Sequence, residues 1–99
     1  MFVDVSFFEV EEGMERVFER DFRGVVEHAA REPGCISSEL VKLDEDLHYA
    51  WVERWSTREM HNAFNEILFG QLLPAMPDFG RYATRLVDRD AEGYVVVET

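Results

Sequence analysis

The sequence has little cysteine, little positive charge and no long apolar run. Cys35 is the only cysteine, which excludes an intrachain disulfide and favours a reducing, cytoplasmic location. Only 10 lysines and arginines accompany 21 acidic residues, for a formal net charge of −11. This balance argues against nucleic acids and anionic membranes as partners, because both bind clustered Lys and Arg. No apolar stretch approaches the roughly 20 residues of a membrane span, and the first residues lack the basic start of a signal peptide.

What the chain does contain is enough apolar material for one core. Its 99 residues fit a single domain, 1–99, and 46% of them are hydrophobic and 13% aromatic, so the chain is too apolar to be disordered. A chain of this size buries only about 60–68% of its unfolded surface and therefore gains stability from a partner.

Hydrophobic periodicity predicts the order of the secondary-structure elements. The expected elements are a strand over 2–10, a helix over 12–31, strands over 35–43 and 47–55, a second helix after 55, a short helix over 70–76, a strand over 81–88 and a short strand over 94–97. Pro33-Gly34 ends the first helix, and Ser56 with Glu59 forms a capping box that opens the second. This βαββαβ order predicts an α+β, ferredoxin-like domain in which both helices cover one face of an antiparallel sheet.

The second face of such a sheet has no helix to cover it. It would expose an apolar patch of a kind that a soluble monomer rarely tolerates, made of Val3, Val5, Phe7, Ile36, Leu40, Ala50 and Val52. Packing this face against a second copy buries the patch, so we expect a homodimer with two-fold symmetry. The C-terminal tail, 89–99, would then serve as an edge strand that pairs with the partner subunit.

Two short motifs resemble elements of the antibiotic biosynthesis monooxygenase family. Arg31-Glu32-Pro33-Gly34-Cys35, before the second strand, is similar to the family's E-P-G-C/F element, and Glu53-Arg54-Trp55-Ser56 is similar to its E-x-W element. The resemblance extends over residues 2–88 in element order and spacing. It implies a dimeric α/β barrel in which two subunits pack sheet to sheet, with a ligand pocket between the helices and the sheet of each. Members include cofactor-independent monooxygenases of polycyclic phenols and haem-degrading enzymes.

The resemblance implies that Trp55 faces the helices, and strand alternation then places Trp51 and Glu53 on the same face. The matching face of the first strand holds Asp4, Ser6 and Phe8, and that of the second holds Ser37, Glu39 and Val41. Indole and phenyl rings with a few polar groups describe a slot for a flat aromatic ligand. The substrate-binding candidates are Ser6, Phe8, Glu39, Trp51, Trp55 and Phe64. The alternative is that Trp51 and Trp55 simply fill the core.

The candidates for acid–base chemistry are His61 and Glu53. In the anthrone-oxidising members, Trp55 has a counterpart in the pocket, while the family's Asn, Tyr and Arg correspond here to Trp51, His61 and Ala75. His61 would serve as base in place of the Tyr, since imidazole titrates near neutral pH; the alternative is an exposed helix residue. A buried Glu53 with a raised pKa is the second candidate base, unless it only accepts a hydrogen bond from a neighbour.

Neither a metal nor a cofactor is expected. The haem-degrading members need an Asn, a Trp and an iron-ligating His where this chain has Ser6, Phe64 and Pro74, and proline cannot ligate iron. His28, His48 and His61 lie on separate elements without zinc-ligand spacing. The favoured hypothesis is a cofactor-independent monooxygenase of a flat phenolic or quinone-like molecule. The alternative is a non-catalytic dimeric protein that binds a small hydrophobic ligand.

Overall fold

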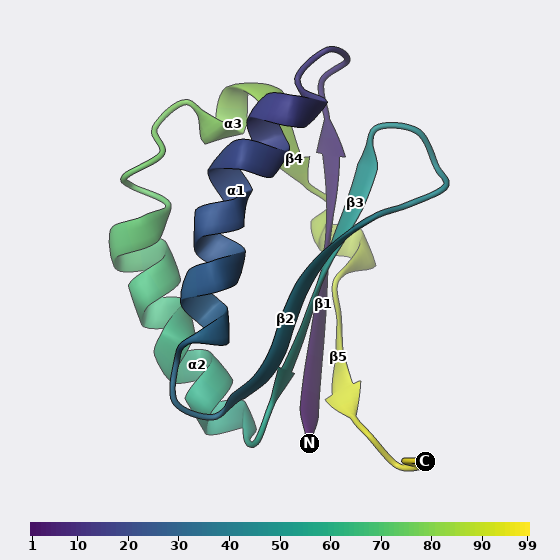
Figure 1. The fold of residues 1–99 in the computed structure, drawn as a ribbon, viewed down its shortest axis with the longest axis vertical. Helices are drawn as coiled ribbons and strands as arrows, with labels where there is room; N and C mark the ends of the chain where they lie inside the picture. The colour runs from purple at the N-terminus through teal and green to yellow at the C-terminus, as the bar shows by residue number, and fades with distance from the viewer.

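An antiparallel sheet with β1, Phe2–Val10, at its centre organises the chain, in the order β2-β3-β1-β4 (Figure 1). The computed structural model describes residues 1–99. The remaining strands are β2, Cys35–Lys42; β3, His48–Trp55; β4, Ala83–Arg85; and β5, Ala91–Tyr94. The α+β, ferredoxin-like fold predicted from the sequence is confirmed.

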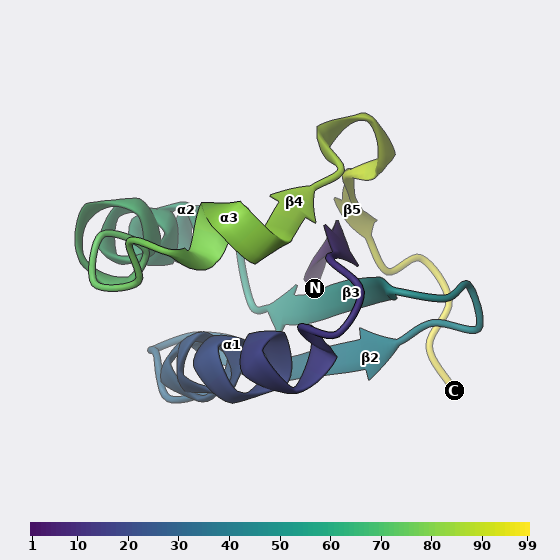
Figure 2. The same ribbon diagram turned by 90° about the horizontal axis from the view of Figure 1, so that it is seen from above.

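Both long helices lie on one side of this sheet (Figures 1 and 2). Helix α1, Glu15–Ala30, buries an apolar stripe at helical spacing against the strands: Phe18, Phe22, Val25 and Ala29. Helix α2, Arg58–Ile67, packs beside it. Rings from α1, β1 and β3 contact one another in the core; the Phe18 and Tyr49 ring centroids, for example, are 4.7 Å apart. None of the helices has the length and apolar character needed to cross a bilayer.

The predicted facing of β2 was wrong because the strand contains an irregularity between Cys35 and Ser37. A shift of one residue moves every following side chain to the other face. Leu40 consequently pairs with Trp51 and packs against the core, whereas Glu39 pairs with Val52 on the opposite face and is exposed. Ser37 and Val41 also change sides, so β2 contributes Cys35, Ser38 and Leu40 to the helix-covered face.

Helix α2 begins one residue later than predicted, and its inward stripe differs from the prediction at two positions. Thr57, not Ser56, caps it by accepting a hydrogen bond from the Met60 peptide N–H at 3.2 Å. The sequence predicts Met60, Phe64, Ile67 and Leu68 as the buried stripe of this helix. The structure instead turns His61, Phe64, Asn65 and Leu68 inward, and Met60 is exposed. The short helix predicted over 70–76 was wrong: α2 runs directly into a π-helical turn, Leu68–Leu72, closed by the Leu73 N–H to Leu68 carbonyl bond of 2.9 Å.

The chain after α2 departs most from the prediction. The short helix α3, Phe79–Tyr82, precedes β4, which is three residues long instead of the predicted eight. The fifth strand lies at Ala91–Tyr94, earlier than the predicted 94–97, and pairs with β1 of the same chain. This pairing is possible because β4 pairs with β1 only from Phe8 to Val10 and leaves the first half of the same edge of β1 free for β5. Pairing of the tail with a partner subunit stays a prediction for the residues beyond Tyr94, which lie on the side of the sheet away from the helices (Figures 1 and 2).

The two short motifs of the sequence lie side by side in the fold. Cys35 and Trp55 are directly opposite each other on β2 and β3, and the Ser56 peptide N–H donates to the Gly34 carbonyl at 2.8 Å. Gly34 has φ +84°, a conformation that favours glycine, and an added Cβ would meet the Met60 sulfur at 2.0 Å. These two junctions together fix where α2 leaves the sheet.

Candidate active site

A cavity of about 150 Å³ lies between the sheet and the helices. Its polar lining consists of Asp4, Ser6, Glu53, His61 and Asn65. Its apolar lining consists of Phe8, Phe22, Trp51, Leu68, Phe69, Leu73 and Phe79. The exposed side chains of Arg85 and Glu92 complete the wall. Polar groups converging at one end of an apolar cavity are typical of small-molecule sites.

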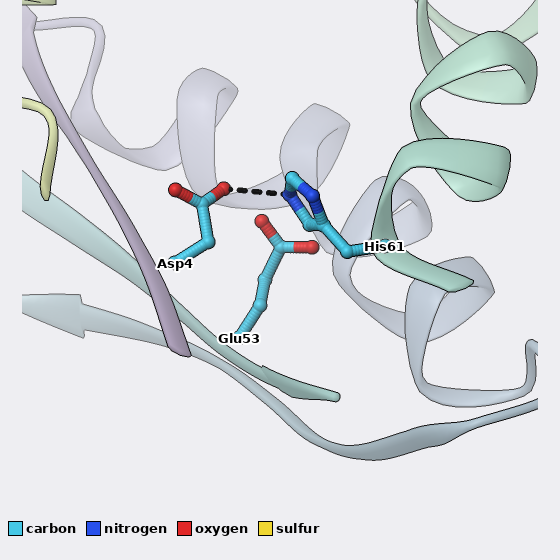
Figure 3. A group of neighbouring side chains, drawn as sticks. All are labelled: Asp4, Glu53 and His61. Carbon is cyan, nitrogen blue, oxygen red and sulfur yellow. Dashed lines mark hydrogen bonds and ion pairs between the residues drawn. The ribbon is translucent and has the colours of Figure 1, made fainter. Parts of the chain in front are cut away.

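Three buried ionisable side chains meet at the polar end (Figure 3). Asp4 on β1 is directly opposite Glu53 on β3. Side chains alternate between the two faces of a strand, and both residues lie on the buried face that the helices cover. His61 enters from the first turn of α2, and its Nε2 lies 2.9 Å from Asp4 Oδ2. Only 2% of His61 and 1% of Glu53 is exposed. We call Asp4, Glu53 and His61 the acid–base cluster.

Further hydrogen bonds hold the acid–base cluster in place. The Trp55 indole Nε1–H donates to Glu53 Oε1 at 3.2 Å, and His61 Nδ1 lies 3.1 Å from Asn62 Oδ1. The ring of Phe2 packs against the imidazole with a centroid separation of 5.0 Å. With both ring nitrogens engaged and one face covered, the imidazole has a fixed orientation.

The surroundings of the acid–base cluster raise the pKa of both Glu53 and His61, for different reasons. Burial, followed by the negative charge of Asp4, raises the pKa of Glu53 to about 8. For His61, burial is the largest single effect and by itself lowers the pKa. The hydrogen bonds to Asp4 and Asn62 and the charge of Asp4 together outweigh burial, so the pKa of His61 is raised. Near neutral pH the cluster therefore contains a neutral carboxylic acid beside an imidazole that readily holds a proton.

These three residues are also the set with which the chain could hold a metal ion, since their ligand-type atoms all lie within 4.8 Å of one another. The contacts fit shared protons better than a metal. Both nitrogens of His61 are already hydrogen-bonded, and a metal would have to displace Asp4 or Asn62 from one of them. The expectation that the protein uses neither metal nor cofactor stays a prediction.

The structure brings together five of the residues chosen from the sequence. His61 and Glu53 meet in the acid–base cluster, and Ser6, Phe8 and Trp51 line the cavity. The Trp51 indole Nε1–H donates to Ser38 Oγ at 2.9 Å, and its ring meets that of Phe22 edge-on at 5.1 Å. The alternative that His61 is an exposed helix residue is wrong, because Asp4 provides a buried partner for its imidazole.

Three other predicted positions do not line the cavity. Trp55 and Phe64 stack on each other, with ring centroids 5.6 Å apart and planes inclined by 28°, and belong to the buried core. Trp55 acts on the site through its hydrogen bond to Glu53 and through the edge-on contact of its ring with the His61 imidazole, with centroids 6.0 Å apart. Glu39 is exposed on the opposite face of the sheet, as a result of the irregularity in β2.

The residue of the acid–base cluster that was not singled out as a site residue is Asp4. A signal for it was present, since strand alternation places an acid on the inward face of an apolar strand, and a buried carboxylate needs a partner. Leu73 and Phe79 were also missed. They follow α2 in a stretch broken by Gly70, Pro74 and Pro77, where no periodic pattern indicates which side chains turn inward.

Comparison with known proteins places this geometry in context. The family model described as antibiotic biosynthesis monooxygenase matches residues 1–66, a segment that includes all of Asp4, Glu53 and His61. No curated protein matches the sequence.

Solved structures match over nearly the whole chain. A protein from Nitrosomonas europaea assigned as an antibiotic biosynthesis monooxygenase is 18% identical, with a TM-score of 0.81, over 98% of this chain and 100% of that chain. SnoaB, described as a cofactor-independent oxygenase from Streptomyces nogalater, is 22% identical, with a TM-score of 0.72, over 98% of this chain and 94% of that chain. MhuD, solved with two manganese protoporphyrin IX molecules per active site, is 18% identical, with a TM-score of 0.71, over 100% of this chain and 98% of that chain. Likeness at this identity shows the shared fold.

Proposed function

The chain belongs to the antibiotic biosynthesis monooxygenase family, and from this we propose that it is a cofactor-independent monooxygenase of a flat phenolic or quinone-like small molecule. The observation that carries the proposal is the buried acid–base cluster at the end of an aromatic-walled cavity. Electron-rich organic anions can react with O2 without a cofactor, and a group that removes the substrate's proton supplies such an anion. A fold shared with a described cofactor-independent oxygenase agrees with this chemistry.

In the proposed reaction the Asp4–His61 pair accepts the proton of the substrate hydroxyl. A hydrogen bond of 2.9 Å makes the two side chains one acid–base unit, so the proton belongs to the pair. General-base catalysis of this kind contributes about 10²–10⁴-fold to a rate. The resulting phenolate transfers one electron to O2, and the two radicals then join, forming a carbon–oxygen bond at a ring carbon.

Neutral Glu53 completes the reaction as the acid. It protonates the new peroxide, and the cluster then removes the hydrogen from the same ring carbon while the oxygen–oxygen bond breaks. One oxygen atom stays on carbon as a quinone carbonyl and the other leaves as water, so that a phenol and O2 give a quinone and water. The ring is oxidised and O2 is reduced. Burial keeps Glu53 protonated at neutral pH, as this role requires.

The same proposal includes a homodimer. On the face of the sheet without helices, Ile36 and Val41 are 51% and 41% exposed, and Val3, Val5, Phe7 and Val52 are half-buried beside them. A second copy packed on this face would remove these side chains from water, which stabilises association by about 25 cal/mol for each Å² of apolar surface buried.

Oxygen uptake tests the proposal. Purified protein is added to phenols, hydroquinones and anthrones in an oxygen electrode, beside the Asp4→Asn variant, which keeps the shape of Asp4 but loses its charge. We expect uptake with at least one phenolic class, retained by the control Asp44→Asn and lost in Asp4→Asn.

The second candidate function is non-catalytic binding of a hydrophobic ligand, which the largely aromatic wall favours. Saturable binding with no oxygen uptake by the unaltered protein would select it.

A further inference from the structure

We infer that the cavity takes a single-ring phenol, with its hydroxyl group at the acid–base cluster and its ring beside Trp51, and that it rejects fused three-ring phenols. This inference rests on the proposed function and narrows it to a substrate class. It goes beyond the family resemblance, which points to polycyclic phenols.

The volume of the cavity matches a single aromatic ring. The cavity measures about 150 Å³, which matches the volume of an engineered apolar protein cavity that binds one benzene molecule. Pockets for larger, drug-sized ligands measure roughly 300–1,000 Å³. One aromatic ring therefore fills this volume, and additional fused rings exceed it.

Successive inward-facing residue pairs of β1 and β3 are spaced by about the length of one phenol molecule. Asp4 and Glu53 face each other on β1 and β3, and Ser6 faces Trp51 two residues further along β1. Two residues of strand span about 6.6–6.8 Å, which is close to the length of a ring with its hydroxyl group. A ring at the Ser6–Trp51 level therefore places its hydroxyl oxygen at the acid–base cluster.

Aromatic rings close the cavity at Phe8, the next inward-facing residue of β1. Phe8, two residues beyond Ser6, contacts Phe22 and Phe79 with ring centroid separations of 5.1 and 6.2 Å, and Phe22 and Phe79 stack on each other at 5.6 Å. These three rings contact one another and form the end wall of the cavity. A ligand cannot extend past Phe8 without separating them.

The test measures binding without turnover. Phenol, 2-naphthol and 1-hydroxyanthracene carry the same hydroxyl group on one, two and three rings. Their affinities are measured under anaerobic conditions by quenching of tryptophan fluorescence. Added apolar area normally tightens binding. We expect the reverse order here, with at least tenfold weaker binding of the three-ring compound than of phenol.

A pair of neighbouring leucines gives the matched variants. Leu73 lines the cavity and Leu72 does not, although both pack against the core. Leu73→Ala enlarges the cavity and should improve the binding of 2-naphthol relative to phenol at least fivefold, whereas Leu72→Ala should leave that ratio unchanged. Circular dichroism establishes that both variants are folded.

Two outcomes would overturn the inference: tighter binding of 1-hydroxyanthracene than of phenol by the unaltered protein, or no saturable binding of phenol at all. The proposed function fails separately, through absence of oxygen uptake. Selective binding of phenol without uptake would uphold the single-ring site and reject the oxygenase.

Discussion

The imidazole Nε2 of His61 lies 2.9 Å from the Oδ2 of Asp4, a residue 57 positions earlier in the chain. This bond joins the first turn of α2 to the central strand of the sheet, and it is buried. Neither residue would keep its position without the other, since a buried carboxylate or imidazole without a partner costs stability. The acid–base cluster consequently exists only in the folded chain.

Replacing His61 should abolish oxygenase activity. His61→Gln retains an amide that can donate to Asp4 but cannot take up a proton, so we expect oxygen uptake to fall by about 10²-fold or more. Stability should fall by only about 1–2 kcal/mol, because Asp4 keeps a donor. The control is His28→Gln on the outer part of α1, where the imidazole bonds only to Glu32. Full activity of His61→Gln would remove His61 from the mechanism.

Stability should decrease as the pH rises toward 8. The pKa of Glu53 is raised from its ordinary value near 4.5 to about 8 in the folded protein, so the folded state binds the proton more tightly than the unfolded state. The contribution of Glu53 to the free energy of unfolding is complete below about pH 4.5 and is lost as the pH rises through about 8. The free energy of unfolding then falls by up to about 1.4 kcal/mol per pH unit. The raised pKa of His61 acts in the same direction.

Urea unfolding between pH 5 and 9 measures this dependence. In Glu53→Gln the free energy of unfolding should depend less steeply on pH, since the amide does not titrate. In Glu39→Gln, a change at an exposed residue, it should depend on pH as in the unaltered protein. Equal slopes in all three proteins would show that Glu53 ionises normally.

Replacing each tryptophan in turn by phenylalanine should distinguish a residue of the cavity wall from a residue of the core. Trp51 lines the cavity, so Trp51→Phe should abolish most of the fluorescence quenching by phenol at a cost in stability of about 1–2 kcal/mol. Trp55 is fully buried, stacks on Phe64 and binds Glu53, so Trp55→Phe should cost more, about 2–4 kcal/mol, and keep the quenching. Quenching lost only in Trp55→Phe would place the ligand elsewhere.

The protein should be a dimer in solution. Light scattering after size-exclusion chromatography should give twice the chain mass of 11.6 kDa at micromolar concentration. Ile36→Asp should yield a folded monomer, because this side chain is 51% exposed in the single chain and its charge costs little there. Ala63→Asp, on the exposed face of α2, should remain dimeric. A monomeric unaltered protein would contradict the proposed assembly.

Haem should not bind in a defined way. The sequence resemblance implies that Pro74 stands where the haem-degrading members have their iron-ligating His, and a cavity of about 150 Å³ is far too small for a porphyrin. Titration with hemin should give no Soret band of a His-ligated species and no ring opening on addition of ascorbate. Stoichiometric binding followed by turnover would show that the cavity wall opens widely.

The parts of the site that the sequence predicted correctly follow from regular alternation. β1 and β3 are unbroken strands, so placing Trp55 inward was enough to place Trp51, Glu53 and Ser6 as well. The same reasoning failed on β2, because a single irregularity near Cys35 reversed the facing of Glu39. On α2, apolarity favoured Met60, yet His61 is inward. The partner that makes this burial possible lies on another element, and periodicity does not reveal such long-range pairs.

The order of the cavity-lining residues along the chain has a consequence for the evolution of this protein. Asp4, Glu53 and His61 lie within the stretch that matches the family, 1–66, whereas Leu73, Phe79 and other size-limiting side chains follow it. The stretch 1–66 thus encodes the acid–base cluster together with part of the cavity wall, whereas the stretch after it adds wall residues and no member of the cluster. Mutations in the second stretch can retune which molecules enter while the reactive groups stay intact. A library of variants restricted to residues 68–92 is therefore the economical route to new substrate ranges on this scaffold.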